Sequence, residues 1–85
     1  MELQFTARFK KDYKKLPSVI QKRTDEKLKT LSNNFLYPSL RVKKIKGSKD
    51  IFEASITMNY RVLFQIDFNA LIFLRVGLRD ILNKV

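Results

Sequence analysis

The sequence predicts an α+β domain of 85 residues, in which an αα-hairpin packs on one face of a mainly antiparallel four-stranded sheet. Three observations lead to this class. Before residue 34, apolar residues recur every three or four positions in two consecutive segments, which is the helical period. After residue 50 the period becomes two, and Ile, Phe, Val and Leu dominate. The chain is short enough that residues 1–85 are expected to form a single domain.

The N-terminal part is expected to contain a strand and two helices. Residues 2–5 alternate polar and apolar, as a short strand does. Thr6 is a suitable N-cap for a helix that runs to about Leu16, because Pro17 must end it. A second helix is expected over about 18–33, with its apolar residues on one face.

The C-terminal part is expected to contain three strands. A basic segment, "SLRVKKIKG", follows the helices and leads into a turn at Gly47 and Ser48. Strands are then expected over about 51–57, 60–66 and 70–76. The resulting order is β-α-α-β-β-β, which favours helices laid on one face of the sheet.

Strand register decides which side chains share a face. A three-residue loop at 57–59 places Ser55 opposite Arg61 and gives the helices an apolar face drawn from alternate residues. The same loop length at 67–69 places Arg61 opposite Arg75, and two like charges in that position favour an anion, either Glu53 or a phosphate. The outer face is then expected to present Glu53, Ser55, Arg61, Gln65 and Arg75, with Leu63, Leu71 and Phe73 among them and Arg79 just beyond Gly77.

Composition restricts the chemistry of the protein. The chain has no cysteine and no histidine, which excludes disulfides, thiol nucleophiles, Cys/His metal sites and imidazole catalysis. We expect no metal and no cofactor. No apolar stretch approaches the ~18 to 20 residues that span a bilayer, and no signal sequence is evident, so a soluble cytoplasmic protein is expected.

Charge is the strongest global signal. The chain carries 18 Lys and Arg against 8 Asp and Glu, for a net charge of +10. Such a field favours polyanions, of which nucleic acid is the commonest in a cell, although an acidic protein is an alternative partner. Most helix lysines are expected to form an ordinary solvated surface. The polar sheet face has the same two interpretations, because arginines suit phosphate and sheets often carry charged outer faces.

The segment "IFEASITMNYRVLFQI", followed by "FLRVGLRDIL" and preceded by "SLRVKKIKG", resembles the RelE/ParE superfamily of toxins from bacterial and archaeal toxin–antitoxin pairs. The likeness covers nearly the whole chain, and "YRVLF" and "RVGLRD" are its most specific parts. It implies a toxin of a type II module that enters the ribosomal A site, contacts rRNA and cleaves mRNA, until a cognate antitoxin inhibits it. The "YR" motif, "VKKIKG" and the tail arginine favour the RelE-like branch.

The resemblance also implies roles for single residues. The functional arginine of the "YR" motif falls on Arg61, and the basic residue after the tail glycine falls on Arg79. Two family lysines fall on Glu53 and Ser55 and are absent, although some relatives use a glutamate as the base. The functional tyrosine or histidine that many members carry near the C-terminus has no counterpart in "DILNKV".

RNA cleavage by a ribose 2′-hydroxyl needs a base, stabilisation of charge on the phosphate, and an acid for the leaving 5′-oxygen. Arg61 and Arg79 are expected to stabilise charge. Glu53 is the candidate base, and an ion pair with Arg61 is its alternative role. The candidates for the acid are Lys44, Lys46 and Tyr60. The residues expected to bind RNA are Arg41, Lys43, Lys44, Lys46, Ser55 and Arg75.

Because this acid–base set is incomplete, enzymatic activity stays open, and two other functions remain. The ParE-like branch implies non-hydrolytic inhibition of DNA gyrase. A catalytically weak member would mainly bind its antitoxin.

Overall fold

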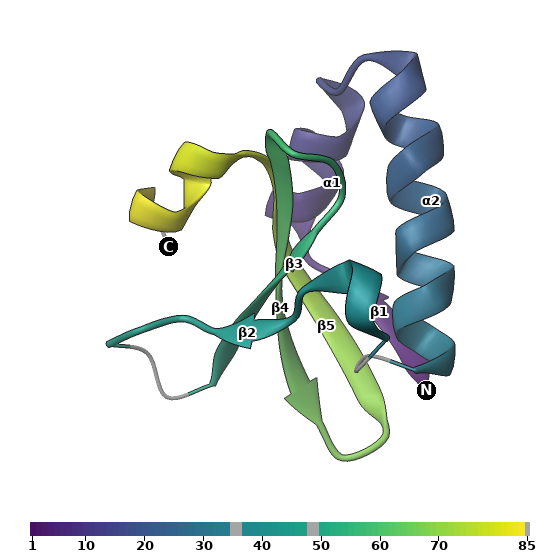
Figure 1. Cartoon of the computed structure of the whole chain (residues 1–85), viewed down its shortest axis with the longest axis vertical. Coiled ribbons are helices and arrows are strands. Elements are labelled where there is room, and N and C mark those ends of the chain that lie inside the picture. Colours follow the sequence, from purple (N-terminus) through teal and green to yellow (C-terminus); the bar gives the residue numbers. More distant parts are fainter. Residues whose placement is uncertain (35–36, 48–49, 85) are drawn as a thin grey trace.

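The computed structural model describes residues 1–34, 37–47 and 50–84, and it confirms the α+β class (Figure 1). Both helices have the predicted positions, and the strands lie within two residues of the predicted bounds. The elements in chain order are β1 (Glu2–Phe5), α1 (Ala7–Lys14), α2 (Ser18–Asn33), the 3-10 helix η1 (Pro38–Leu40), β2 (Lys43–Lys44), β3 (Ile51–Ser55), β4 (Tyr60–Asp67), β5 (Ala70–Leu78) and the 3-10 helix η2 (Arg79–Lys84).

The sheet has five strands rather than the predicted four, in the order β1-β5-β4-β3-β2. The additional strand is β2, in which Lys43 and Lys44 of the basic segment pair with β3. β1 runs parallel to β5, and the other neighbours are antiparallel. Of the predicted turn, Gly47 has a φ of 84°, which glycine tolerates, and Ser48 lies outside the described residues.

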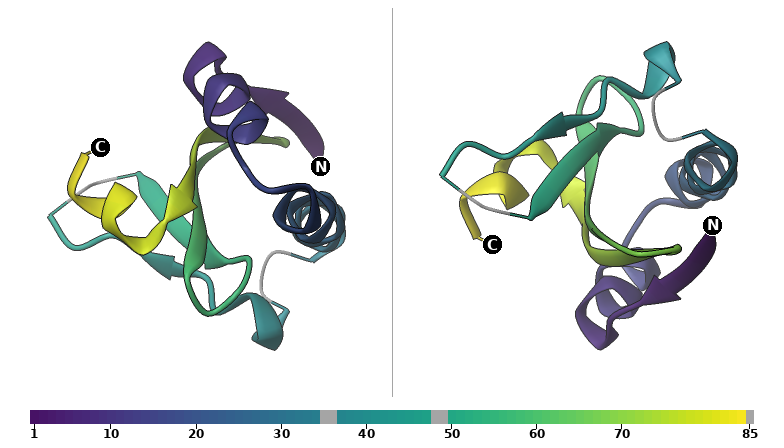
Figure 2. Two further views of the ribbon diagram at one scale, coloured as in Figure 1. Left: turned by 90° about the horizontal axis from the view of Figure 1, so that it is seen from above. Right: turned by 90° about the horizontal axis from the view of Figure 1, so that it is seen from below.

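The two helices lie on one side of the sheet and η2 lies on the other (Figure 2). Thr6 fixes the start of α1, because its side-chain oxygen accepts a hydrogen bond from the backbone N of Phe9 at 3.1 Å. The same hydroxyl donates to the carbonyl of Leu74 at 3.1 Å, which ties the helix start to β5. The predicted N-cap is therefore confirmed, and it also anchors the helix to the sheet.

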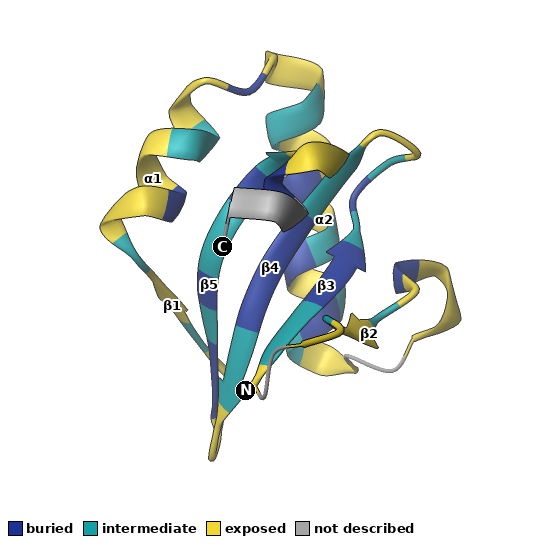
Figure 3. Ribbon diagram, turned by 90° about the vertical axis from the view of Figure 1, so that its left-hand side faces the viewer, coloured by how far each residue is buried: buried dark blue, intermediate teal, exposed yellow. Residues whose placement is uncertain are grey.

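The core lies between the helices and the sheet, along β3, β4 and β5 (Figure 3). Thr24, Leu28 and Leu31 form the buried side of α2. The apolar face predicted for the first hairpin is confirmed, since Ser55 pairs with Arg61 and the alternate residues of both strands pack against the core cluster. The buried members of that face are Ala54, Ile56, Val62 and Phe64.

The register predicted for the second hairpin is wrong. Asp67 pairs with Ala70, so the turn has two residues, Phe68 and Asn69, instead of three. The strand pairing then shifts by one residue between Leu63 and Phe64, at a β-bulge. As a result Arg75 lies opposite Leu63 and Arg61 lies opposite Gly77, rather than opposite each other.

The changed register moves apolar residues of β5 to the core. Phe73 was expected on the outer face, but it is fully buried, with ring centroids 5.5, 5.8 and 5.9 Å from those of Phe5, Phe9 and Phe64. Leu71 is buried in the same core cluster. A shorter turn reverses which residues of a strand point inward, because side chains alternate between the faces.

The outer face of the sheet is partly covered. Leu63 was expected to be exposed there, but it is fully buried. The segment η2 packs against β4 and β5, and its Ile81 is buried. At Gly77 a Cβ atom would lie 3.0 Å from Cγ2 of Ile81, so the close approach of η2 favours glycine at this position.

Candidate nucleic-acid interface

A groove of about 440 Å³ lies where the β3–β4 hairpin meets α2, η1 and η2. Each element contributes side chains from a different part of the sequence. Its polar lining comes from Lys27 on α2, Ser39 and Arg41 at η1, Ser55 and Arg61 on the hairpin strands, and Arg79 at the start of η2. The hairpin tip adds Ile56, Thr57 and Met58.

The groove is strongly positive. Four of its lining residues are Lys or Arg, and no Asp or Glu is among the described residues that line it. Four like charges in one groove repel each other and are stabilised together by an anion. Arginine side chains donate in a planar fork that matches phosphate oxygens, so the groove suits a phosphate group of nucleic acid.

Arg61 holds the hairpin loop as well as lining the groove. Its Nη1 donates to the backbone carbonyls of Met58 at 2.9 Å and Tyr60 at 3.0 Å, and also to that of Thr57. The loop is closed further by the Thr57 hydroxyl oxygen, which accepts from the backbone N of Asn59 at 3.3 Å. One amino group of Arg61 is thereby committed to the loop, and a ligand must be met by its remaining donors.

Arg79 reaches the same groove because η2 is attached to the hairpin. Its backbone N donates to the carbonyl of Asn59 at 3.0 Å. The two arginines on which the sequence interpretation depended, Arg61 and Arg79, therefore line one groove from two elements. The Arg79 side chain is exposed, so a ligand has direct access to it.

Arg41 lines the groove from a strained backbone position. Its φ of 50° and ψ of 46° lie in the left-handed region, which costs a residue other than glycine about 1–2 kcal/mol. The preceding Leu40 is fully buried and anchors the segment in the core. Such strain recurs at functional sites, where the surrounding structure maintains it. The backbone conformation of Arg41 thus agrees with a binding role.

Glu53 lies outside this groove. It was expected to be exposed and to pair with Arg61, but it is 3 % exposed and pairs with Lys43, whose Nζ lies 3.0 Å from Oε1. Both structural expectations are therefore wrong. Its other oxygen, Oε2, is buried and has no hydrogen-bond partner among the described residues. A carboxylate in this position is poorly placed to take a proton from a ligand in the groove.

Arg75 also lies outside the groove, because it is bound to α1. Its Nε and Nη2 donate to the two carboxylate oxygens of Asp12 at 2.6 and 3.0 Å. Oδ2 of Asp12 accepts a further hydrogen bond from the backbone N of Val76 at 3.3 Å. The hydrogen bonds that Arg75 donates to Asp12 raise the pKa of Arg75, burial lowers it, and the Asp12 charge adds a smaller upward shift. The geometry is that of a structural ion pair.

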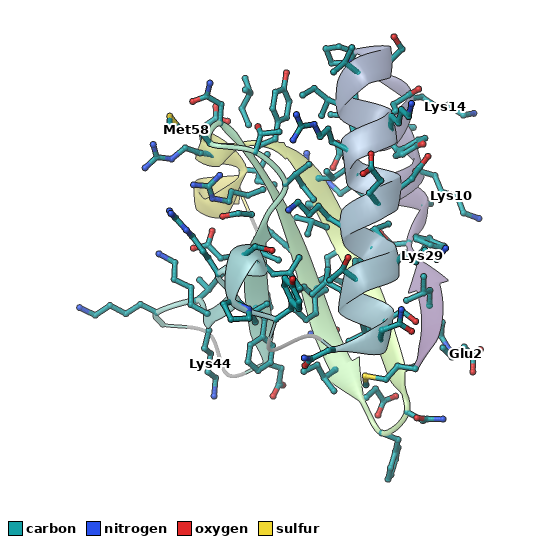
Figure 4. The ribbon with its side chains drawn as sticks, turned by 45° about the vertical axis from the view of Figure 1, so that its right-hand side comes forward. Glu2, Lys10, Lys14, Lys29, Lys44 and Met58 are labelled. Carbon is teal, nitrogen blue, oxygen red and sulfur yellow. The ribbon has the colours of Figure 1, made fainter. Side chains whose placement is uncertain are left out.

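The lysines of the basic segment occupy the edge of the sheet. Lys43, Lys44 and Lys46 are exposed and are not among the residues that line the groove. Figure 4 shows Lys44 extending from β2 into solvent. Tyr60 packs against the core cluster. None of the residues considered as the acid lines the groove, whereas Lys27 does, and sequence analysis did not single it out.

Two further features of the described residues bear on the site. In ranges 1–34, 37–47 and 50–84, no three acidic residues come together in a group that could hold a metal ion. No helix in the same ranges is both long enough and apolar enough to cross a membrane.

Comparisons with known proteins identify the family. The model of the ParE toxin of type II toxin–antitoxin systems, parDE, matches residues 3–82. A comparison with curated protein sequences gives no match.

Among solved structures, the chain is similar to the RelB–RelE antitoxin–toxin complex of Methanococcus jannaschii, with 29% identity, 95% of each chain covered and a TM-score of 0.78. It is also similar to the toxin–antitoxin complex RelBE2 of Mycobacterium tuberculosis, with 28% identity, 92% and 96% covered and a TM-score of 0.76. The YoeB/ParE toxin of Agrobacterium tumefaciens shares the fold, with a TM-score of 0.80 at 13% identity over 93% and 99% of the two chains. The chain therefore belongs to the ParE-toxin family of the RelE/ParE superfamily, the toxins of type II toxin–antitoxin systems.

Proposed function

We propose that the protein is a ribosome-dependent mRNA endonuclease that acts in the cytoplasm and inhibits translation. The observation that supports this proposal is the groove lined by Lys27, Arg41, Arg61 and Arg79, to which no carboxylate of the described residues contributes. The likeness to RelE toxins at 28 and 29% identity agrees with it. In this proposal the groove binds the scissile phosphate of an mRNA held by the ribosome, and Lys43, Lys44 and Lys46 bind neighbouring RNA.

The groove suits the charge that develops during RNA cleavage. Attack of the 2′-oxygen on phosphorus places additional negative charge on the phosphate oxygens. Preorganised cations lower the energy of that state, and a single well-placed donor contributes about 10²–10³ in rate. We assign this role to the guanidinium groups of Arg61 and Arg79, because both residues line the groove. The Arg61 side chain is hydrogen-bonded to the hairpin loop, and the backbone N of Arg79 is bonded to the same loop.

An antitoxin is the second proposed partner. The Methanococcus jannaschii and Mycobacterium tuberculosis relatives are complexes of a toxin with its antitoxin. A net charge of +10 favours an acidic antitoxin, and exposed apolar side chains such as Phe5, Val19 and Leu78 suit its amphipathic segments. Binding of such a chain would offset the positive charge and cover the apolar surface.

The test compares wild type with Arg79→Ala and with Arg8→Ala. Arg79 lines the groove through its side chain, whereas its contact with the hairpin uses the backbone and survives the substitution. Arg8 is an exposed arginine of α1 outside the groove, so its loss changes net charge equally. After induction, mapping of mRNA 5′ ends should show cuts at ribosome-bound codons for wild type and Arg8→Ala. For Arg79→Ala we expect roughly 10²–10³ less cleavage.

Non-hydrolytic inhibition of DNA gyrase is the second candidate, and the match to the ParE-toxin model favours it. Growth arrest with DNA damage and intact mRNA would support this candidate and reject the endonuclease. Absence of any growth arrest on induction would instead support a member that mainly binds its antitoxin.

A further inference from the structure

Lys27 is the one residue that α2 contributes to the described lining of the groove. It follows Thr24 by three residues and precedes Leu31 by four, and both of those side chains are fully buried. Residues at these spacings share a helix face, so Lys27 lies at the edge of the face that packs on the sheet. Lys27 is half-buried, whereas Arg23 and Lys29 on the same helix are exposed.

Lys29 is a second lysine of α2, and it is not among the residues that line the groove. In Figure 4, Lys29 extends from α2 on the side away from Met58, which marks the tip of the hairpin. Met58 itself lines the groove with Lys27. Of these two lysines, Lys27 lines the groove together with the hairpin residue Arg61, and Lys29 therefore serves as the matched control.

Lys27 is also the lining cation that can transfer a proton. The three arginines keep their protons in proteins, so they stabilise charge but do not protonate a leaving group. The remaining polar lining consists of the hydroxyls of Ser39, Ser55 and Thr57, which are much weaker acids. An ammonium group combines a positive charge with a transferable proton.

Building on the proposed endonuclease function, we propose that Lys27 is the general acid of RNA cleavage. The 2′-oxygen forms a bond to phosphorus while the bond between phosphorus and the 5′-oxygen breaks. The proton of Lys27 Nζ passes to the leaving 5′-oxygen, and the proton of the 2′-hydroxyl passes to water. The products are a 2′,3′-cyclic phosphate and a free 5′-hydroxyl, and the neutral amine of Lys27 regains its proton from water.

Two mRNAs test this role on programmed ribosomes under single-turnover conditions. One carries the ordinary linkage in the A-site codon, and the other has sulfur in place of the bridging 5′-oxygen. A thiolate leaves without being protonated, so the second substrate does not need a general acid. The variants are Lys27→Gln, Lys27→Arg and the matched control Lys29→Gln, each verified as folded by circular dichroism.

On the ordinary linkage we expect Lys27→Gln and Lys27→Arg to cleave about 10²–10⁴ times more slowly than wild type, which is the usual contribution of a general acid. On the sulfur linkage we expect both variants to approach the wild-type rate. Lys29→Gln should equal wild type on both substrates.

Three outcomes overturn the assignment and are distinguishable. Wild-type cleavage of the ordinary linkage by Lys27→Gln removes Lys27 from the reaction. Equally slow cleavage of both substrates by both variants assigns Lys27 to positioning instead of proton transfer. Both of these outcomes leave the proposed endonuclease function intact, provided that Arg79→Ala cleaves slowly in the same assay. Failure of wild type to cleave either substrate rejects the proposed function itself.

Discussion

The ion pair between Asp12 and Arg75 should contribute more to stability than any other polar contact described above. We predict that Asp12→Ala lowers the free energy of unfolding by about 2–4 kcal/mol. The substitution removes two hydrogen bonds to a charged donor, at 2.6 and 3.0 Å, and one to the backbone of β5. Hydrogen bonds to charged groups contribute about 1.5–3 kcal/mol each, and loss of one partner leaves the other charge uncompensated.

The lower part of that range applies because water reaches both partners. Their side chains are 15% and 14% exposed, so the pair is partly screened. The total stability of a chain of this length is about 4–13 kcal/mol, and each kcal/mol corresponds to about 4–8 °C in Tm. Asp12→Ala is therefore expected to lower Tm by at least 8 °C, by the same scaling.

Urea unfolding followed by far-UV circular dichroism measures this change, with Asp25→Ala as the control. Asp25 accepts a hydrogen bond from the Tyr13 hydroxyl at 2.7 Å but is exposed, so its loss should cost less than about 1 kcal/mol. A value for Asp12→Ala within about 0.5 kcal/mol of wild type would refute the reasoning. If Arg75→Ala then weakened RNA binding without loss of stability, Arg75 would be a nucleic-acid ligand, as the sequence analysis expected.

Three further predictions concern single positions. Phe68→Gly should stabilise the protein by about 0.5–1 kcal/mol, because Phe68 has a φ of 51° and its side chain is 99% exposed. Glycine removes about 1–2 kcal/mol of backbone strain at an entropic cost of about 0.5–1 kcal/mol. A lower Tm for this variant in thermal unfolding would contradict the prediction. Lys43→Met should destabilise the protein by about 1–3 kcal/mol, because it leaves the Glu53 carboxylate buried without its ion-pair partner. The double variant Lys43→Met, Glu53→Leu should regain this stability in urea unfolding. An equal loss of stability in the single and the double variant would contradict the prediction. The hydrogen bond to Asp25 raises the pKa of Tyr13, with burial and the Asp25 charge adding to the shift, so the folded state favours the protonated phenol. Its contribution is complete below pH ~10 and is lost as pH rises above that value. Tyr13→Phe should therefore lose less stability than wild type between pH 9 and pH 11, and parallel pH profiles would contradict the linkage.

Sequence reasoning predicted the first hairpin and failed at the second for a definable reason. The apolar alternation from Phe52 to Ile66 selects one register at the first loop, since any other register mixes the faces. In β5 nearly every residue from 70 to 76 is apolar, so alternation cannot identify the inward side. The turn residue Phe68 adopts a positive φ, which is unusual for an aromatic side chain, and the β-bulge carries no sequence signal of its own.

The candidate site was predictable in part. Arg61 and Arg79 were identified from motifs and do line one groove. Arg75 and Glu53 were placed on the outer face from the predicted strand register. Each has an ion-pair partner that this register does not reveal, because Asp12 lies on α1 and Lys43 lies on the unpredicted strand β2. Lys27 was not considered in the sequence analysis. Its three-residue distance from the buried Thr24 places it at the edge of the packed face of α2, but this spacing does not show which other element lies opposite it.

The pairing of β1 with β5 has a consequence for synthesis of the protein. Glu2 aligns with Ala70, and the Thr6 hydroxyl binds a carbonyl 68 residues later. A chain emerging from the ribosome N-terminus first thus carries its first strand and helix without their sheet neighbour until nearly all of the domain has been made. Contacts this distant in sequence also slow folding. A chain interrupted before β5 would lack the strand that pairs with β1, and it would also lack Arg79. Such shortened chains should therefore be inactive as toxins.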